Sequence, residues 1–221
     1  MGPPPQQAKK KRRFRPPPPP PPRWRLPVHR RPFWAGIAVG LGVSAALLTV
    51  TLLRGPSSPS ANAPWGANWT HLRERLRALG LPALPVEGRA LHTHEHLDLY
   101  LNGTHVAVPA NVGIGPAGDR FFSPLHTHDR TGILHVESPA KIEYTLGQFF
   151  GVWGVRLSAT CIGNYCARDG RTLQAFVDGN RVQGDPARIP LRRHAEIVLA
   201  FGTAAQLPKR IPSSYGFPDG Y

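Results

Sequence analysis

The chain has 221 residues, with 27 lysines and arginines against 13 aspartates and glutamates, which gives a formal net charge of +14. Ten of the basic residues lie within residues 1–33, which contain no aspartate or glutamate, so the basicity belongs mainly to the N-terminal segment. Because the remainder has no basic stripe interleaved with aromatic residues, the composition argues against nucleic-acid binding.

Residues 1–32 are predicted to form a disordered, basic and proline-rich cytoplasmic tail. Five consecutive basic residues occupy 9–13, and seven consecutive prolines occupy 16–22. Proline fixes φ and lacks a backbone N–H, so the run favours extended polyproline II without a core. Residues 9–31 then suit either a cytoplasmic partner or anionic lipid headgroups, and the simpler alternative is a tail that only sets the membrane orientation.

Residues 33–53 are predicted to form one transmembrane helix. All 21 positions are uncharged and most are apolar, and as a helix they would extend ~30 Å, the thickness of a bilayer's hydrocarbon core. Basic residues concentrate before this segment, so the positive-inside rule predicts a single-pass protein of the cell membrane with a cytoplasmic N-terminus and an extracytoplasmic C-terminal domain. The alternative is a cleaved signal peptide with Ala61-Asn62-Ala63 as its cleavage site, but an apolar run longer than about 15 residues favours an uncleaved anchor.

One domain is predicted after the membrane segment. Residues 54–63, rich in proline and serine, would form a linker, and residues 64–203 an extracytoplasmic metal-binding domain. Its length of roughly 140 residues is enough for one hydrophobic core. The pattern favours the α+β class, a single β-rich unit with a mixed or antiparallel sheet and one or two helices. Residues 204–221, rich in proline, serine and glycine, are predicted to be a flexible tail.

Two helices are indicated within this domain. The first is predicted over residues 69–79, with Asn68 as its N-terminal cap. Its apolar residues recur with the spacing of one helical face: Trp69, Leu72, Leu76 and Leu79. Thr145 and Gln148 fit a capping box, which predicts a second, short helix that ends at about Trp153.

Residues 91–100, which read LHTHEHLDLY, are predicted to form a strand. Alternate residues of a strand share a face, so the leucines at 97, 99 and 101 would point into the core. The other face would present His92, His94, His96 and Asp98. Asn102-Gly103 suits a type I′ turn and predicts a hairpin, and Asp178-Gly179 predicts a second one.

Two further histidine motifs follow this strand. Residues 126–129 read His-Thr-His-Asp, and an extended segment over 132–138 would place His135 and Glu137 on one face. Seven of the chain's ten histidines fall from His92 to His135, and His105 is one of them. Imidazole is a common ligand of transition metals, and a His-x-His pair on a strand supplies two ligands on one face.

The sequence therefore predicts a metal site with the ligands His92, His94, His96, His126, His128 and His135. The predicted cofactor is a copper or zinc ion, because the only methionine is Met1 and imidazole ligands suit both metals. The Irving–Williams order favours Cu²⁺. The alternative is a cluster of histidines held together by hydrogen bonds alone. His71 and His105 are not included, since the first lies off the apolar face of its helix and the second has an undetermined face.

Three functions remain open from these patterns. The first is extracytoplasmic metal binding for sequestration, delivery or sensing. The second is a metal-dependent hydrolase or oxidase with an open coordination position, in which Glu137 or Asp129 would act as general base. The third is a structural subunit of a membrane complex. A site closed by four protein ligands would favour the first or third, whereas three ligands and a water molecule would favour the second.

The two cysteines of the chain, Cys161 and Cys166, enclose four residues. Disulfides persist outside the cytoplasm, so a disulfide that fixes a loop is predicted here.

A resemblance accompanies the second histidine motif. Residues 125–139 read LHTHDRTGILHVESP, followed by TLGQFF at 145–150 and Trp-Gly at 153–154. These motifs resemble a family of uncharacterised bacterial membrane-anchored proteins with an LHTHDxTGxxHVESP-type histidine motif. The resemblance extends over residues 90–202 and implies a domain boundary but no particular activity.

Overall fold

A computed structural model describes residues 61–221. The predictions of a cytoplasmic tail at 1–32 and of a transmembrane helix at 33–53 lie outside the described residues, as does most of the linker at 54–63. Within residues 61–221, no helix is long and apolar enough to cross a membrane. The described part is a domain dominated by a mixed sheet with two α-helices, which confirms the predicted α+β class.

The strands of the described domain are β1 (Ala61–Asn62), β2 (Leu91–Leu101), β3 (Thr104–Ala107), β4 (Leu125–His126), β5 (Ile133–Ser138), β6 (Cys161–Ile162), β7 (Tyr165–Cys166), β8 (Thr172–Val177), β9 (Asn180–Val182) and β10 (Glu196–Gly202). The helices are α2 (Leu72–Ala78), α3 (Leu146–Trp153) and the 3-10 helix η2 (Pro186–Arg188).

Eight of these strands form one sheet around the long strand β2. The main path runs β1-β3-β2-β10-β8-β9, while β5 pairs with β2 and β4 pairs with β5. The β2–β10 and β1–β3 pairs are parallel and the others are antiparallel. Strand β2 pairs with β5 through its first half and with β3 and β10 through its second half. The remaining strands, β6 and β7, form a small hairpin of their own.

Both predicted hairpin turns are present. Asn102 and Gly103 have φ values of 51° and 89°, and Asp178 and Gly179 have 51° and 77°. A type I′ turn requires positive φ at both central residues, which asparagine, aspartate and glycine tolerate best. These turns connect β2 to β3 and β8 to β9.

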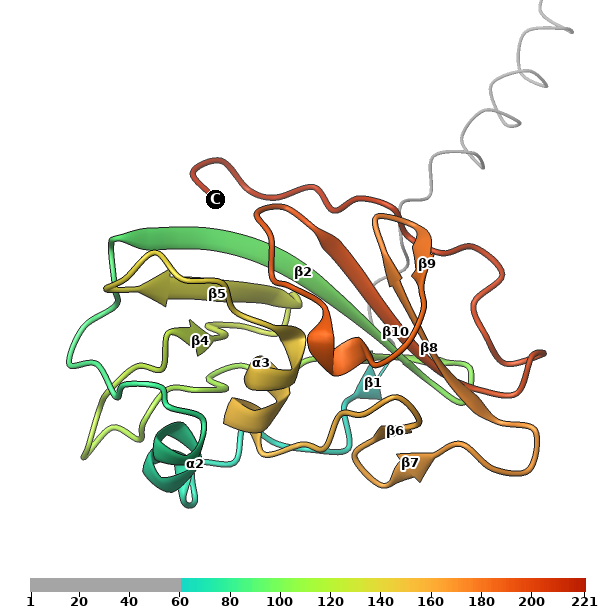
Figure 1. Ribbon diagram of the computed structural model, residues 1–221, viewed down its shortest axis with the longest axis horizontal. Coiled ribbons are helices and arrows are strands. Elements are labelled where there is room, and N and C mark those ends of the chain that lie inside the picture. The colour runs from blue at the N-terminus through green and yellow to red at the C-terminus, as the bar shows by residue number, and fades with distance from the viewer. Residues whose placement is uncertain (1–60) are drawn as a thin grey trace, which may run out of the picture. The chain divides into compact units, whose positions relative to one another are not determined.

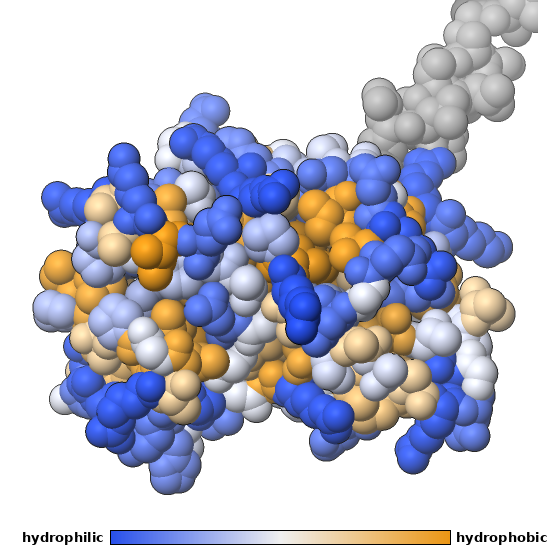
Figure 2. Space-filling view, in the orientation of Figure 1, coloured by the Kyte–Doolittle hydropathy of each residue, from blue (hydrophilic) through white to orange (hydrophobic). Residues whose placement is uncertain are grey.

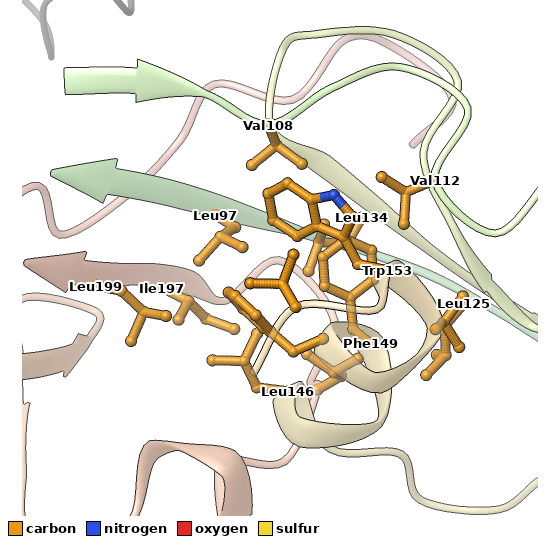
Figure 3. Close-up of a cluster of buried hydrophobic side chains, with 14 of the residues drawn as sticks. Leu97, Val108, Val112, Leu125, Leu134, Leu146, Phe149, Trp153, Ile197 and Leu199 are labelled. Carbon is orange, nitrogen blue, oxygen red and sulfur yellow. The ribbon is translucent and has the colours of Figure 1, made fainter. Parts of the chain in front are cut away.

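The hydrophobic core lies between one face of the sheet and helix α3. In Figure 3, Phe149 and Trp153 of α3 point toward Leu97 and Leu134 of the sheet, and all four side chains are at most 2% exposed. The helix begins with the predicted capping box, in which Thr145 and Gln148 each bond the other's backbone N–H. The leucine alternation of β2 therefore points into this core, as the sequence predicts.

Helix α2 is shorter than predicted. It begins at Leu72, and its N-terminal cap position is His71, which makes no capping side-chain bond. The prediction of Asn68 as cap is therefore wrong. The Arg75 guanidinium instead bonds the carbonyl oxygens of Asn68 and Thr70, which fixes the chain as it enters the helix. Leu72 and Leu76 are buried as predicted, while Trp69 is 53% exposed.

The opposite face of the sheet is covered by the segment that follows β10. This segment, coloured red in Figure 1, runs along the side of the sheet away from α2 and α3. It has no regular secondary structure, yet Tyr215 stacks on His96 and Phe217 stacks on His194. Residues 204–221, predicted to be flexible, therefore make defined contacts with the sheet. On the molecular face seen in Figure 2, hydrophobic residues are exposed in separate patches between hydrophilic ones.

Candidate metal centre

The register of three strands brings histidines together on the face of the sheet opposite α3. In the β2–β5 pair, His94 lies opposite His135 and His92 opposite Glu137. In the β4–β5 pair, His126 also lies opposite His135. Directly opposed residues of antiparallel strands hold their Cβ atoms about 4.5–5.5 Å apart, so these side chains are in contact. We call the resulting group the histidine cluster; its members are His92, His94, His126, His128, His135 and Glu137.

One part of the histidine cluster is formed by β4, the residues after it, and β5. The Nε2 atoms of His126 and His128 lie 3.2 Å apart. The rings of His128 and His135 are 4.4 Å apart, and those of His126 and His135 are stacked at 5.2 Å. One donor atom from each of these three histidines and one from Glu137 all lie within 4.8 Å of one another. This arrangement offers three imidazoles and a carboxylate to a metal ion.

The other part is formed by β2 with Glu137. The Nε2 atoms of His92 and His94 lie 3.2 Å apart, and each histidine offers a donor within 4.8 Å of Glu137. The Oε1 atom of Glu137 is 3.4 Å from His92 Nε2 and 3.0 Å from His135 Nδ1. Glu137 therefore belongs to both parts of the cluster.

Two buried imidazoles of the cluster, those of His94 and His126, are held in the neutral form. Burial lowers the pKa of His126 to about 3 and that of His94 to about 4. The His126 Nδ1–H group donates to the Ser123 carbonyl oxygen at 2.9 Å, which leaves a lone pair on Nε2. A neutral ring with a free nitrogen lone pair is the form that binds a metal.

Glu137 is held as a carboxylate. Burial raises its pKa, but the hydrogen bond from His135 and the electrostatic influence of the neighbouring histidine side chains outweigh burial and hold the pKa below its usual range. Within the cluster His94, His126, His135 and Glu137 are buried. The His92 and His128 side chains are 52% and 37% exposed, so the cluster opens to solvent beside these two residues.

His96 does not join the other five predicted ligands. Its ring stacks on Tyr215 at 3.8 Å, and both nitrogens are engaged, with Nδ1 2.8 Å from Glu196 Oε2 and Nε2 2.9 Å from the Thr131 carbonyl oxygen. Burial lowers the pKa of His96, but Glu196 and Asp98 raise it above its ordinary value. The Nε2–H group donates to the carbonyl oxygen, and Nδ1 is engaged by the carboxyl group of Glu196. His96, Asp98 and Glu196 thus form a separate buried group, whose donor atoms lie within 4.8 Å of one another.

Of the two acidic residues predicted as general bases, only Glu137 lies in the cluster. Asp129 is exposed, and its carboxylate accepts bonds from the backbone N–H and hydroxyl of Thr131. Asp129 therefore shapes the turn between β4 and β5.

No family model, curated protein or solved structure matches this chain. The functional interpretation therefore rests on the chemistry and geometry of these side chains.

Two further residues lie beside the cluster, and no sequence pattern indicates that they belong to the site. Glu87 comes from the loop before β2, and its Oε1 atom lies 3.3 Å from His128 Nε2. The Tyr221 ring lies 4.5 Å from the His94 ring and 5.6 Å from the His135 ring, so it covers part of the cluster. Glu87 is distant in sequence from His128, and Tyr221 from both His94 and His135, so only the fold brings these partners close.

The disulfide and two surface cavities lie apart from the histidine cluster. Cys161 and Cys166 form the predicted disulfide between β6 and β7. A cavity of 560 Å³ is lined by Trp65, Tyr165 and Cys166 among others. A second cavity of 760 Å³ lies beside the β8–β9 hairpin and η2. No member of the histidine cluster lines either cavity.

Proposed function

We propose that this protein binds a transition metal ion through the histidine cluster, and that the primary ligands are His126, His128 and His135. The observation that carries the proposal is the approach of these three imidazoles and Glu137 to within 4.8 Å on one face of the sheet. Three nitrogen ligands with a nearby carboxylate are the donor set of many zinc and copper sites.

The spacing of the nitrogen atoms supports metal binding over a hydrogen-bonded cluster. Two nitrogens bound to one ion at ~2.0–2.1 Å lie about 2.9 Å apart at a right angle and about 3.4 Å apart at the tetrahedral angle. The two Nε2 pairs of the cluster, His126 with His128 and His92 with His94, are each 3.2 Å apart. If hydrogen bonds alone joined the rings, one nitrogen of each pair would have to carry a proton and donate it to the other. The remaining nitrogen lone pairs of the buried rings would then have few donors to satisfy them.

The donor set favours copper or zinc. The two cysteines are joined in a disulfide, and the only methionine of the chain is Met1, so imidazole and carboxylate remain as ligands. Imidazole binds Cu²⁺ and Zn²⁺ well, and Cu²⁺ stands highest in the Irving–Williams order. We propose Cu²⁺ as the tighter-binding ion and Zn²⁺ as the second.

We further propose that the site lies outside the cytoplasm, tethered by the segment 33–53, and that it sequesters, delivers or senses the ion. The exposed side chains of His92 and His128 support this role, because they give solvent ions access to the buried rings. The same opening supports a second candidate function, a metal-dependent enzyme, since catalytic sites keep one coordination position for water or substrate.

Metal titration of the full-length protein tests the proposal. Protein stripped with a chelator is titrated with Cu²⁺ or Zn²⁺ while a competing chromophoric chelator reports the affinity. Replacing the partly exposed His128 with glutamine removes one ligand, so we expect affinity to fall by at least the ~10- to 100-fold that loss of an outer-shell partner causes.

The matched control is His71→Gln, which removes an imidazole that is 75% exposed on a different part of the domain. This variant should bind like the wild type. If the His128→Gln and His126→Gln variants both bind one equivalent of metal with the affinity of the wild type, the proposed site is refuted.

A further inference from the structure

We infer that the histidine cluster is a dinuclear centre, in which two metal ions are bridged by the carboxylate of Glu137. This inference rests on the proposed function and deepens it, because it specifies how many ions the site holds and which residue joins them.

The first observation is that the donors divide into two overlapping groups. His126, His128 and His135 converge with Glu137, and His92 and His94 converge with the same Glu137. Each group fits within 4.8 Å, whereas the six residues together do not form one such group. One ion bound at ~2.0–2.2 Å by histidine and carboxylate cannot use donors that fail to converge at one point.

The second observation is the position of the shared carboxylate. Glu137 Oε1 lies 3.0 Å from a ring nitrogen of His135 in the first group and 3.4 Å from a ring nitrogen of His92 in the second group. The register places Glu137 directly opposite His92 and two residues after His135 on the same face of β5. A carboxylate between two sets of imidazoles is the arrangement that bridges metal ions about 3.5–4 Å apart.

The charges around the cluster are consistent with two cations. Two carboxyl groups lie at the cluster: Glu137 between the two groups of histidines, and Glu87 with its Oε1 atom 3.3 Å from His128 Nε2. The rings of His94 and His135, one from each group, lie 4.6 Å apart, so the two positions are adjacent. Two divalent ions about 3.5–4 Å apart repel each other, and the negative charge of a carboxylate between them offsets part of this repulsion.

Cu²⁺ titration of the full-length protein tests this inference. After chelator treatment and loading, the bound copper is counted by elemental analysis, and electron paramagnetic resonance reports whether the copper ions are magnetically coupled. We expect two ions per chain with a coupled signal. Replacing His92, whose side chain is 52% exposed, with glutamine should reduce uptake to one ion and give the signal of isolated Cu²⁺.

Glu137→Gln keeps the size of the side chain and removes the bridging charge, so it should abolish the coupling. His71→Gln is the control and should retain two coupled ions, and circular dichroism verifies that each variant is folded. One ion per chain that is lost in His128→Gln but kept in His92→Gln would overturn the dinuclear inference and leave the proposed function intact. Two uncoupled ions would overturn the bridge, and the absence of any bound ion would overturn the inference and the proposed function together.

Discussion

At the scale of single residues, burial keeps the ligands of the cluster available for metal. A histidine in water is protonated below about pH 6.5, whereas burial lowers the pKa of His126 to about 3. The bond from its Nδ1 to the Ser123 carbonyl also selects the tautomer whose Nε2 points at His128. The fold therefore holds the His126 imidazole unprotonated and oriented toward His128 before any ion binds.

Because the pKa of His126 is lower in the folded chain than in the unfolded chain, we expect the stability of the metal-free protein to depend on pH. Between pH 6.5 and pH 3 the unfolded chain binds a proton at residue 126 and the folded chain does not, so the contribution of His126 to folding falls as pH falls. Relative to a His126→Gln variant, the wild type should lose about 2 kcal/mol of unfolding free energy between pH 7 and pH 5. Urea denaturation at both pH values, in the presence of chelator, measures the difference.

The comparison between the two proteins isolates His126. Buried Glu95, whose pKa is raised to about 7 by burial, titrates in the same range with the opposite sign, but it does so in both proteins. A stability difference between wild type and variant that stays constant from pH 7 to pH 5 would contradict the assigned pKa of His126.

At the scale of elements, strand periodicity predicts part of the site and register determines the rest. The alternation in residues 91–101 is enough to place the leucines of β2 in the core and its histidines on the other face. The pairing of His94 with His135 depends on how β2 and β5 align, which no local pattern encodes. For the same reason, the sequence does not separate His96 from the cluster, because its partner Glu196 is 100 residues away.

The turn before β5 predicts a strict requirement for glycine at position 132. Gly132 has a φ of +92°, and a Cβ atom there would lie 2.8 Å from both His96 Nε2 and the Leu97 carbonyl oxygen. Gly132→Ala should therefore destabilise the domain by about 1–3 kcal/mol, as measured by urea denaturation. Gly118 has open space around it and serves as the control, since Gly118→Ala should change stability by less than about 0.5 kcal/mol. Equal effects of the two substitutions would contradict this account of the turn.

We expect the segment after β10 to slow the exchange of bound metal, because it covers part of the histidine cluster. Because the ring of Tyr221 lies over His94 and His135, its removal in Tyr221→Ala should expose the cluster. We expect a chelator to remove bound copper several-fold faster from this variant than from the wild type, in a stopped-flow measurement. Tyr221→Phe keeps the ring and should exchange at the wild-type rate. If both variants release copper at the wild-type rate, the tyrosine does not restrict access.

At the scale of the whole molecule, the structure tests the predictions made for residues 61–221, while those made for the N-terminal segments rest on the sequence alone. The α+β class, both hairpins, helix α3 and the disulfide follow from local sequence patterns and are present in the structure. The membrane anchor at 33–53 remains a prediction from hydropathy and charge, and it determines the compartment that the histidine cluster faces.

Protease accessibility tests the predicted orientation. Protease added to intact cells should digest the domain that starts near residue 61, while the basic and proline-rich segment should remain protected on the cytoplasmic side of the membrane. Antibodies against each part would identify the fragments on a blot. Protection of the domain in intact cells, with digestion only after lysis, would contradict the proposed extracytoplasmic site.

The central claim is that histidines from β2, β5 and the β4 segment bind metal together. Anomalous diffraction from crystals of the copper-loaded protein tests it most directly, because the signal locates the ion without reference to any assumed ligand. We expect one peak ~2.0–2.1 Å from ring nitrogens of His126, His128 and His135, and a second peak at the same distance from ring nitrogens of His92 and His94. A copper-loaded crystal with no anomalous peak in the histidine cluster, or with its only peaks on surface residues elsewhere, would contradict the account.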